Sequence, residues 1–155
     1  MKYVFYLIAL LNIVMSCQSV PKEDFSTIEY KSGACFGTCP IYTLILTSDR
    51  QATIKAEHFT FSKEHGEIEG KFTSKISEEN YQKLIELINK TKPSTWKEKY
   101  GNYQITDLPT AYLTLESNSS KWQTQDYGKN GSPELKELWD FIDSLRTKEQ
   151  WKKIN

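Results

Sequence analysis

Histidine is scarce in this chain of 155 residues, which contains only His58 and His65. No Ser-His-Asp order, phosphate-binding glycine loop or spaced His/Glu motif accompanies them. General acid–base and nucleophilic catalysis need such sets of side chains in one place. We therefore expect a protein that is not an enzyme, needs no cofactor and holds no metal.

An excess of charge of either sign is also absent, because 20 basic residues balance 20 acidic ones. Proteins that bind nucleic acid usually gather lysine and arginine into a basic patch. No such patch stands out in the sequence, so we expect no nucleic-acid partner.

A hydrophobic run long enough to cross a bilayer is missing as well. The apolar run at the start, Tyr3 to Met15, covers about 13 residues, whereas a spanning helix needs about 20. Lys2 precedes this run and the small residue Ser16 follows it. A basic start, an apolar middle and a small residue at the exit predict a secretory signal peptide over residues 1–16.

Cys17 follows the predicted signal peptide directly. Val14-Met15-Ser16-Cys17 resembles a bacterial lipobox, in which the cysteine thiol is joined to diacylglycerol and the chain is cut before it. Two or three acyl chains hold a soluble domain firmly on a membrane. We expect lipidation at Cys17, a polar tether over residues 17–26 and a place in the bacterial cell envelope. Gln18 after the cysteine favours the outer membrane. An ordinary signal peptide with an incidental cysteine is the alternative.

The rest of the chain is long enough for one domain, which we place at 27–146, with a polar C-terminal tail at 147–155. Apolar residues alternate, as in strands, over 27–31, 41–47, 52–61 and 68–76, and again over 111–115 and 122–126. Ser77 and Ser132 are suited to cap helices whose apolar residues recur at i, i+3, i+4 and i+7. This order predicts an α+β fold, in which two helices pack on one face of an antiparallel β-sheet.

Cys35 and Cys39 form the one remaining cysteine pair, if Cys17 carries lipid. Outside the cytoplasm such pairs usually oxidise, and Gly37 gives the loop between them backbone freedom. A disulfide that closes five residues stabilises a fold by only about 2 kcal/mol. A soft-metal site, a redox dithiol and two free thiols are the alternatives. The spacing also resembles the copper-binding segment of Sco-type copper chaperones, although here the pair leads into a predicted strand.

Asp107, Tyr103 and Tyr127 are the candidates for contact with a ligand. Asp107 lies in the long loop 91–109 and either acts as an acid in a site or caps a turn. Tyr103 and Tyr127, with Trp96 and Tyr100, either form a platform for a glycan or peptide or close the end of a small core. Glu64, His65, Glu67 and Glu69 cluster as possible metal ligands, but we interpret them as a solvated hairpin tip.

The cysteine segment also carries a family resemblance. Gly33, Cys35-Phe36-Gly37-x-Cys39-Pro40-x-Tyr42, Thr106-Asp107-Leu108-Pro109 and Asp126-Tyr127-Gly128 resemble an uncharacterised family of bacterial lipoproteins with a Cys-Phe-Gly-x-Cys-Pro-x-Tyr signature. The family has no assigned activity, so the resemblance implies no catalytic residue.

Three functions remain open on these grounds, the last of them an enzyme of unknown class with its site near Asp107, Tyr103 and Tyr127. The first is a membrane-tethered extracytoplasmic lipoprotein that serves as a non-catalytic binding or structural module, with a protein or glycan partner. The alternative is a thiol-based protein that handles copper or redox equivalents through Cys35 and Cys39.

Overall fold

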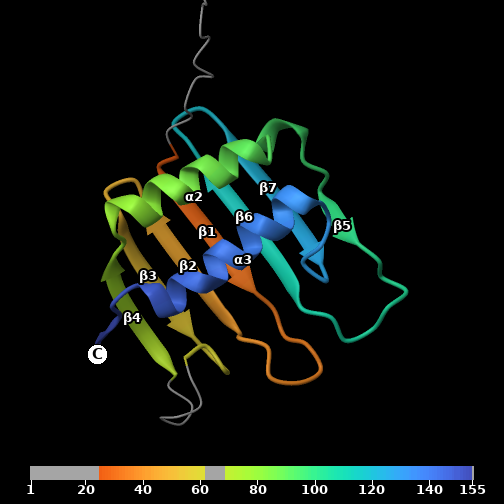
Figure 1. Ribbon diagram of the computed structural model, residues 1–155, viewed down its shortest axis with the longest axis horizontal. Coiled ribbons are helices and arrows are strands. Elements are labelled where there is room, and N and C mark those ends of the chain that lie inside the picture. The colour runs from red at the N-terminus through yellow and green to blue at the C-terminus, as the bar shows by residue number, and fades with distance from the viewer. Residues whose placement is uncertain (1–24, 62–68, 155) are drawn as a thin grey trace, which may run out of the picture.

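The computed structural model describes residues 25–61 and 69–154. It consists of one eight-stranded sheet in the order β5-β7-β6-β1-β2-β3-β4-β8, with helices α2 and α3 lying across one of its faces (Figure 1). The predicted α+β architecture is thereby confirmed. The elements are β1 (Thr27–Ser32), β2 (Tyr42–Thr47), β3 (Gln51–Ala56), β4 (Gly70–Lys75), α2 (Glu78–Lys90), the 3-10 turn η2 (Pro93–Thr95), β5 (Lys99–Gly101), β6 (Thr110–Glu116), β7 (Lys121–Tyr127), α3 (Pro133–Lys148) and β8 (Lys152–Ile154).

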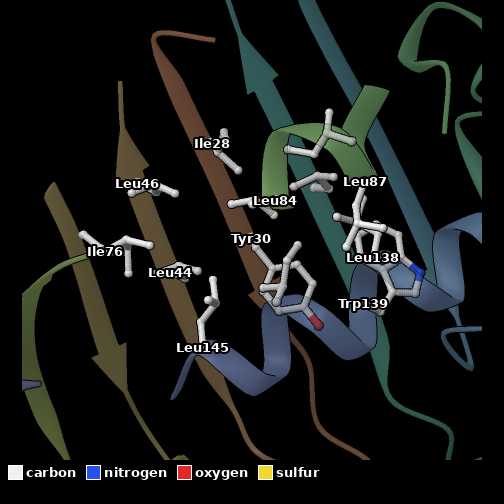
Figure 2. Packing of buried hydrophobic residues seen from close by; sticks show 14 of the residues in the cluster. Ile28, Tyr30, Leu44, Leu46, Ile76, Leu84, Leu87, Leu138, Trp139 and Leu145 are labelled. Carbon is white, nitrogen blue, oxygen red and sulfur yellow. The ribbon is translucent and has the colours of Figure 1, made fainter. Parts of the chain in front are cut away.

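The core lies between the helices and the sheet. Every second residue of the central strands points into it, and Tyr30 of β1 lies between Leu44 of β2 and Leu113 of β6 in the antiparallel register. Both helices contribute their apolar sides to the same core (Figure 2). Their buried residues are Leu84, Ile85, Leu87 and Ile88 of α2, and Leu135, Leu138, Trp139, Ile142 and Leu145 of α3.

Both helices begin at the serines that the sequence indicates. The Ser77 hydroxyl accepts a hydrogen bond from the backbone N–H of Asn80, and the Ser132 hydroxyl accepts one from Leu135. Each cap satisfies an N–H group that has no partner within its helix. Pro133 follows Ser132 at the first helical position, where a missing N–H costs nothing.

Strand β3 ends at Ala56, whereas the alternation predicted a strand as far as Phe61. Phe59 has a positive φ of 54°, which an extended strand cannot contain. The Thr60 hydroxyl then donates to the backbone carbonyl of Ile41, so the chain folds back over the start of β2. The predicted turn at Glu64-His65-Gly66 lies outside the described residues.

The core extends past both predicted domain limits. Phe25, assigned by sequence to the tether, is buried with 2% of its surface exposed. At the other end, residues 152–154 of the predicted polar tail form β8 against β4. Trp151 packs against the core beside it and donates its indole N–H to the carbonyl of Leu145. The polar composition of residues 152–154 gave no sign of a strand, because a strand at the edge of a sheet often carries charged side chains.

The long loop predicted over 91–109 contains a strand. Residues 99–101 form β5, which pairs in parallel with β7. Gly101 permits this pairing, because its φ is +105° and a Cβ placed there would lie 2.1 Å from the backbone oxygen of Tyr127. Three residues are too few to show alternation in a sequence.

Candidate functional site

The cysteine loop and the loop after β5 meet at one end of the sheet. Residues 33–41 join β1 to β2, and residues 102–109 join β5 to β6 (Figure 1). We call these two segments together the loop end. The N–H of Gly33 donates to the carbonyl of Thr110 at 2.8 Å, and the N–H of Phe36 donates to that of Asp107 at 3.1 Å. Backbone hydrogen bonds therefore fix the two loops to each other.

Cys35 and Cys39 lie at disulfide-bonding distance, with Cα atoms 5.7 Å apart. Gly37 between them has a φ of +134°, a conformation that residues with side chains rarely adopt. Phe36 is 88% exposed at the tip of this closed loop. A large apolar side chain is thus exposed to solvent on a loop whose backbone is restrained.

Tyr103, Tyr127 and Asp107 all lie at the loop end or border on it, as part of one arrangement. The rings of Tyr103 and Tyr127 stack with centroids 5.0 Å apart and planes inclined by 13°. The Tyr127 hydroxyl accepts a hydrogen bond from the N–H of Leu108, next to Asp107. Asp107 itself is exposed and has a φ of +68°. Its backbone carbonyl accepts the hydrogen bond from the N–H of Phe36. Tyr103 and Ile105 remain more than half exposed, at 56% and 51%.

The other two aromatic candidates belong to the core. Trp96 and Tyr100 are partly buried and pack against it. The Trp96 indole donates to the hydroxyl of Thr91 at 3.0 Å, which closes the C-terminal end of α2. The four aromatic residues therefore do not form a single platform, and the exposed apolar side chains of the loop end are Phe36, Tyr103 and Ile105.

Between sheet and helix lies a polar cluster that sequence reasoning did not identify. Asp143 of α3 accepts hydrogen bonds from the hydroxyls of Tyr30 and Tyr42 on Oδ1, and from Lys129 Nζ at 2.9 Å on Oδ2. Lys129 also donates to the Ser32 hydroxyl at 3.0 Å. The sequence gives little indication of this cluster. The tyrosines occupy ordinary core positions of alternating strands, and Asp143 directly follows the apolar positions of its helix.

Ser32 and Lys129 are residue types that form a nucleophile and its general base in some enzymes. A lysine base must offer its nitrogen as a proton acceptor. Here Nζ donates to both the carboxylate and the hydroxyl, and Ser32 is completely buried. The cluster therefore saturates its own hydrogen bonds and joins α3 to β1 and β2.

Burial raises the pKa of Tyr30 and of Tyr42 well above the ordinary value of 10.0, and the carboxylate of Asp143 raises both further. The unfolded chain therefore releases these protons at a lower pH than the folded chain does. Their contribution to stability is complete below pH 10 and is lost as the pH rises through the folded-state pKa values.

This linkage predicts a steep alkaline loss of stability that depends on the two tyrosines. Above pH 10, each contributes a fall of about 1.4 kcal/mol per pH unit. The double variant Tyr30→Phe/Tyr42→Phe is expected to be less stable at pH 8 but to lose less on going to about pH 11. Urea unfolding at both values measures this. Equal losses in the variant and the wild type would contradict it, and Tyr103→Phe, at an exposed ring, is the control.

The described residues were compared with the requirements of a metal site and of a membrane-spanning helix. No group of three or more His, Cys, Asp and Glu side chains lies together there. A copper-handling role would thus depend on the two sulfurs of Cys35 and Cys39 in their reduced state. Within residues 25–61 and 69–154, neither helix has the length and apolarity to cross a bilayer. Cys17 and the predicted signal peptide lie outside these ranges.

Comparison with known proteins places the domain in a family. A family model described as "Domain of unknown function (DUF6438)" matches residues 26–146. The match includes the cysteine loop, helix α2, the loop end and α3 as far as Arg146. Searches of curated proteins and of solved structures found no match.

Proposed function

The chain belongs to the DUF6438 family of domains of unknown function, and we propose that this member is a lipid-anchored, extracytoplasmic binding module without catalytic activity. The lipid is attached at Cys17, and the envelope membrane, by preference the outer one, is its site of residence. The loop end is the surface that binds a partner protein.

The exposure of Phe36 is the observation that carries the proposal. A phenylalanine side chain that is 88% exposed leaves a large apolar surface in water. The backbone that carries it is restrained, because the cysteine pair closes the loop and the Phe36 N–H donates to the carbonyl of Asp107. Fixed apolar groups on a rigid loop are typical of binding sites, since little entropy is lost when they enter a pocket.

The chemistry of the loop end favours a protein over a glycan. Phe36 and Ile105 offer apolar surface without hydrogen-bonding groups, and the Tyr103 hydroxyl already accepts a bond from the amide of Gln125 at 2.9 Å. Sugars need free polar groups around an aromatic ring. An apolar pocket on a protein needs only the rings and the aliphatic side chain.

The position of the loop end relative to the anchor fits this role. β1 begins at Thr27, directly after the predicted tether, and ends at Ser32, where the chain enters the cysteine loop (Figure 1). Residues 25 and 26, which lead into β1, and the loop end therefore lie at opposite ends of the central strand. The chain from a lipid at Cys17 would enter the domain at the end of β1 away from Phe36.

Photo-crosslinking in a bacterial host tests both parts. A benzophenone amino acid at position 36 is expected to give a discrete light-dependent adduct in the membrane fraction, whereas the same group at Ser119, an exposed turn residue at the other end of β6, gives none. Radiolabelled palmitate in the same cultures should enter the wild type and not Cys17→Ser.

The outcomes separate the two claims. Equal adducts from positions 36 and 119, or none from either, would refute the loop end as a binding surface. Absence of palmitate from the wild type would refute the lipid anchor and leave the binding surface standing.

A further inference from the structure

The face of the sheet that the helices leave uncovered is strongly basic. The residues on this open face alternate with the buried ones, so their side chains point away from α2 and α3. Lysines far outnumber acidic residues on it within the described strands. The lysines are Lys31, Lys55, Lys71, Lys75, Lys99, Lys121 and Lys152, and the acidic residues are Glu29 and Glu116.

Part of this charge is neutralised locally, and Glu98 lies beside Tyr112 and Gln125 of this face. Lys121 pairs with Glu116 at 2.8 Å, and Lys55 pairs with Glu57 at 3.2 Å just beyond the end of β3. Lys71, Lys99 and Lys152 form no ion pair with a described residue and are exposed. Because the whole chain has equal numbers of basic and acidic residues, a basic sheet face requires the rest of the molecule to be acidic. The two helices on the other side carry seven acidic and five basic residues, so that side has no basic excess.

The open face also carries tyrosines at the edge next to the loop end. Tyr112 of β6 is 41% exposed and lies under the Lys31 ammonium, which is 5.9 Å from the ring centroid. Tyr127 of β7, opposite Thr110 in the register, lies on this same face. Tyrosines beside lysines are typical of surfaces that meet lipid headgroups, where a ring can lie in the interfacial layer and its hydroxyl in water.

We propose that the open face lies against the headgroups of an anionic lipid bilayer. The inference deepens the proposed function and rests on it, because the lipid at Cys17 is what brings the face to the membrane. Segment 17–24, fully extended, spans about 28 Å, so the sheet stays within reach of the surface. Each lysine near such a surface strengthens binding about fivefold.

The layout of the charge favours a bilayer over a single acidic chain. The lysines are spread over β1, β3, β4, β5, β7 and β8, and eight strands span about 34 Å. A bound strand of nucleic acid would follow one basic groove lined with stacking rings. Lysines dispersed over six strands suit a surface of dispersed phosphates better than a single acidic strand.

Vesicle binding by the unlipidated chain tests the proposal. The core residues of the described structure lie between Phe25 and Leu145, so a chain that begins at Gln18 keeps them all. We expect it to sediment with vesicles of phosphatidylglycerol and phosphatidylcholine in equal parts, and not with phosphatidylcholine alone. Binding should weaken as salt is raised, because exposed charges are screened.

A matched pair of triple variants locates the binding face. Lys71→Gln/Lys99→Gln/Lys152→Gln on the open face is expected to weaken vesicle binding about a hundredfold. Lys83→Gln/Lys90→Gln/Lys136→Gln on the helices removes the same charge and should change binding less than threefold. Circular dichroism checks that both variants fold.

Three results would overturn the inference. They are absence of binding to anionic vesicles, equal losses in the two triple variants, and binding to duplex DNA with loss only in the open-face variant but no binding to vesicles. Because the chain used carries no lipid, none of these results bears on Cys17.

Discussion

Trp139→Ala is expected to lower the free energy of unfolding by about 4 kcal/mol, a large part of the stability of a domain of this size. Trp139 is completely buried and its ring stacks on Tyr30 with centroids 5.8 Å apart. Its indole N–H also donates to Asp126 at 2.7 Å, and Asp126 is itself fully buried. The substitution therefore opens a cavity and removes a partner from a buried carboxylate.

Trp139→Phe separates the two contributions. Phenylalanine fills most of the space but cannot donate to Asp126, whose Oδ2 then keeps only the N–H of Gly131 as partner. A loss of about 2 kcal/mol is expected from the missing hydrogen bond to a charged group. Urea unfolding at neutral pH measures both variants. A loss below 1 kcal/mol in Trp139→Ala would show that α3 is not fixed to the sheet as described.

Asp143→Ala is expected to cost about 3 kcal/mol. It removes the one carboxylate that accepts from Tyr30, Tyr42 and Lys129. The Lys129 side chain is only 15% exposed, so its ammonium would remain in a poorly solvated place without a counter-ion. Removal of one member of such a pair costs more than the pair contributes.

Asp140→Ala is the matched control for this prediction. Asp140 lies one turn earlier on α3 and pairs with Lys136, but both side chains are more than half exposed. Exposed pairs of this spacing contribute about 0.5 kcal/mol or less. Similar losses in Asp143→Ala and Asp140→Ala, by urea unfolding, would contradict a structural role for the polar cluster.

The elements that are long and amphipathic were predictable from sequence. Ser77 and Ser132 mark the helix starts correctly, and the alternation around Tyr42 and Leu113 assigns the buried faces of β2 and β6. Local pattern was sufficient there, because helix caps and alternation are local properties. β5 and β8 were missed, since three-residue edge strands are defined by their neighbours in the sheet.

The sites were less predictable for the same reason. Asp107, Tyr103 and Tyr127 were predicted to face a ligand, and the structure places them close together. The backbone carbonyl of Asp107 accepts a hydrogen bond from Phe36, 71 positions away, which no local pattern predicts. The basic face could not be predicted from the sequence, because its lysines come from separate strands. Within each strand, a lysine is one charged residue among polar ones. Only the sheet order adds them together.

The central place of β1 has a mechanical consequence. It pairs antiparallel with β2 on one side and β6 on the other, and within the described residues it leads from Ser26 directly to the loop that carries Phe36. Tension between an anchor and a load at these two points would run along the strand, at right angles to its inter-strand hydrogen bonds. Those bonds would all bear it in shear and would have to break together, so this domain would yield to stretching only as a whole.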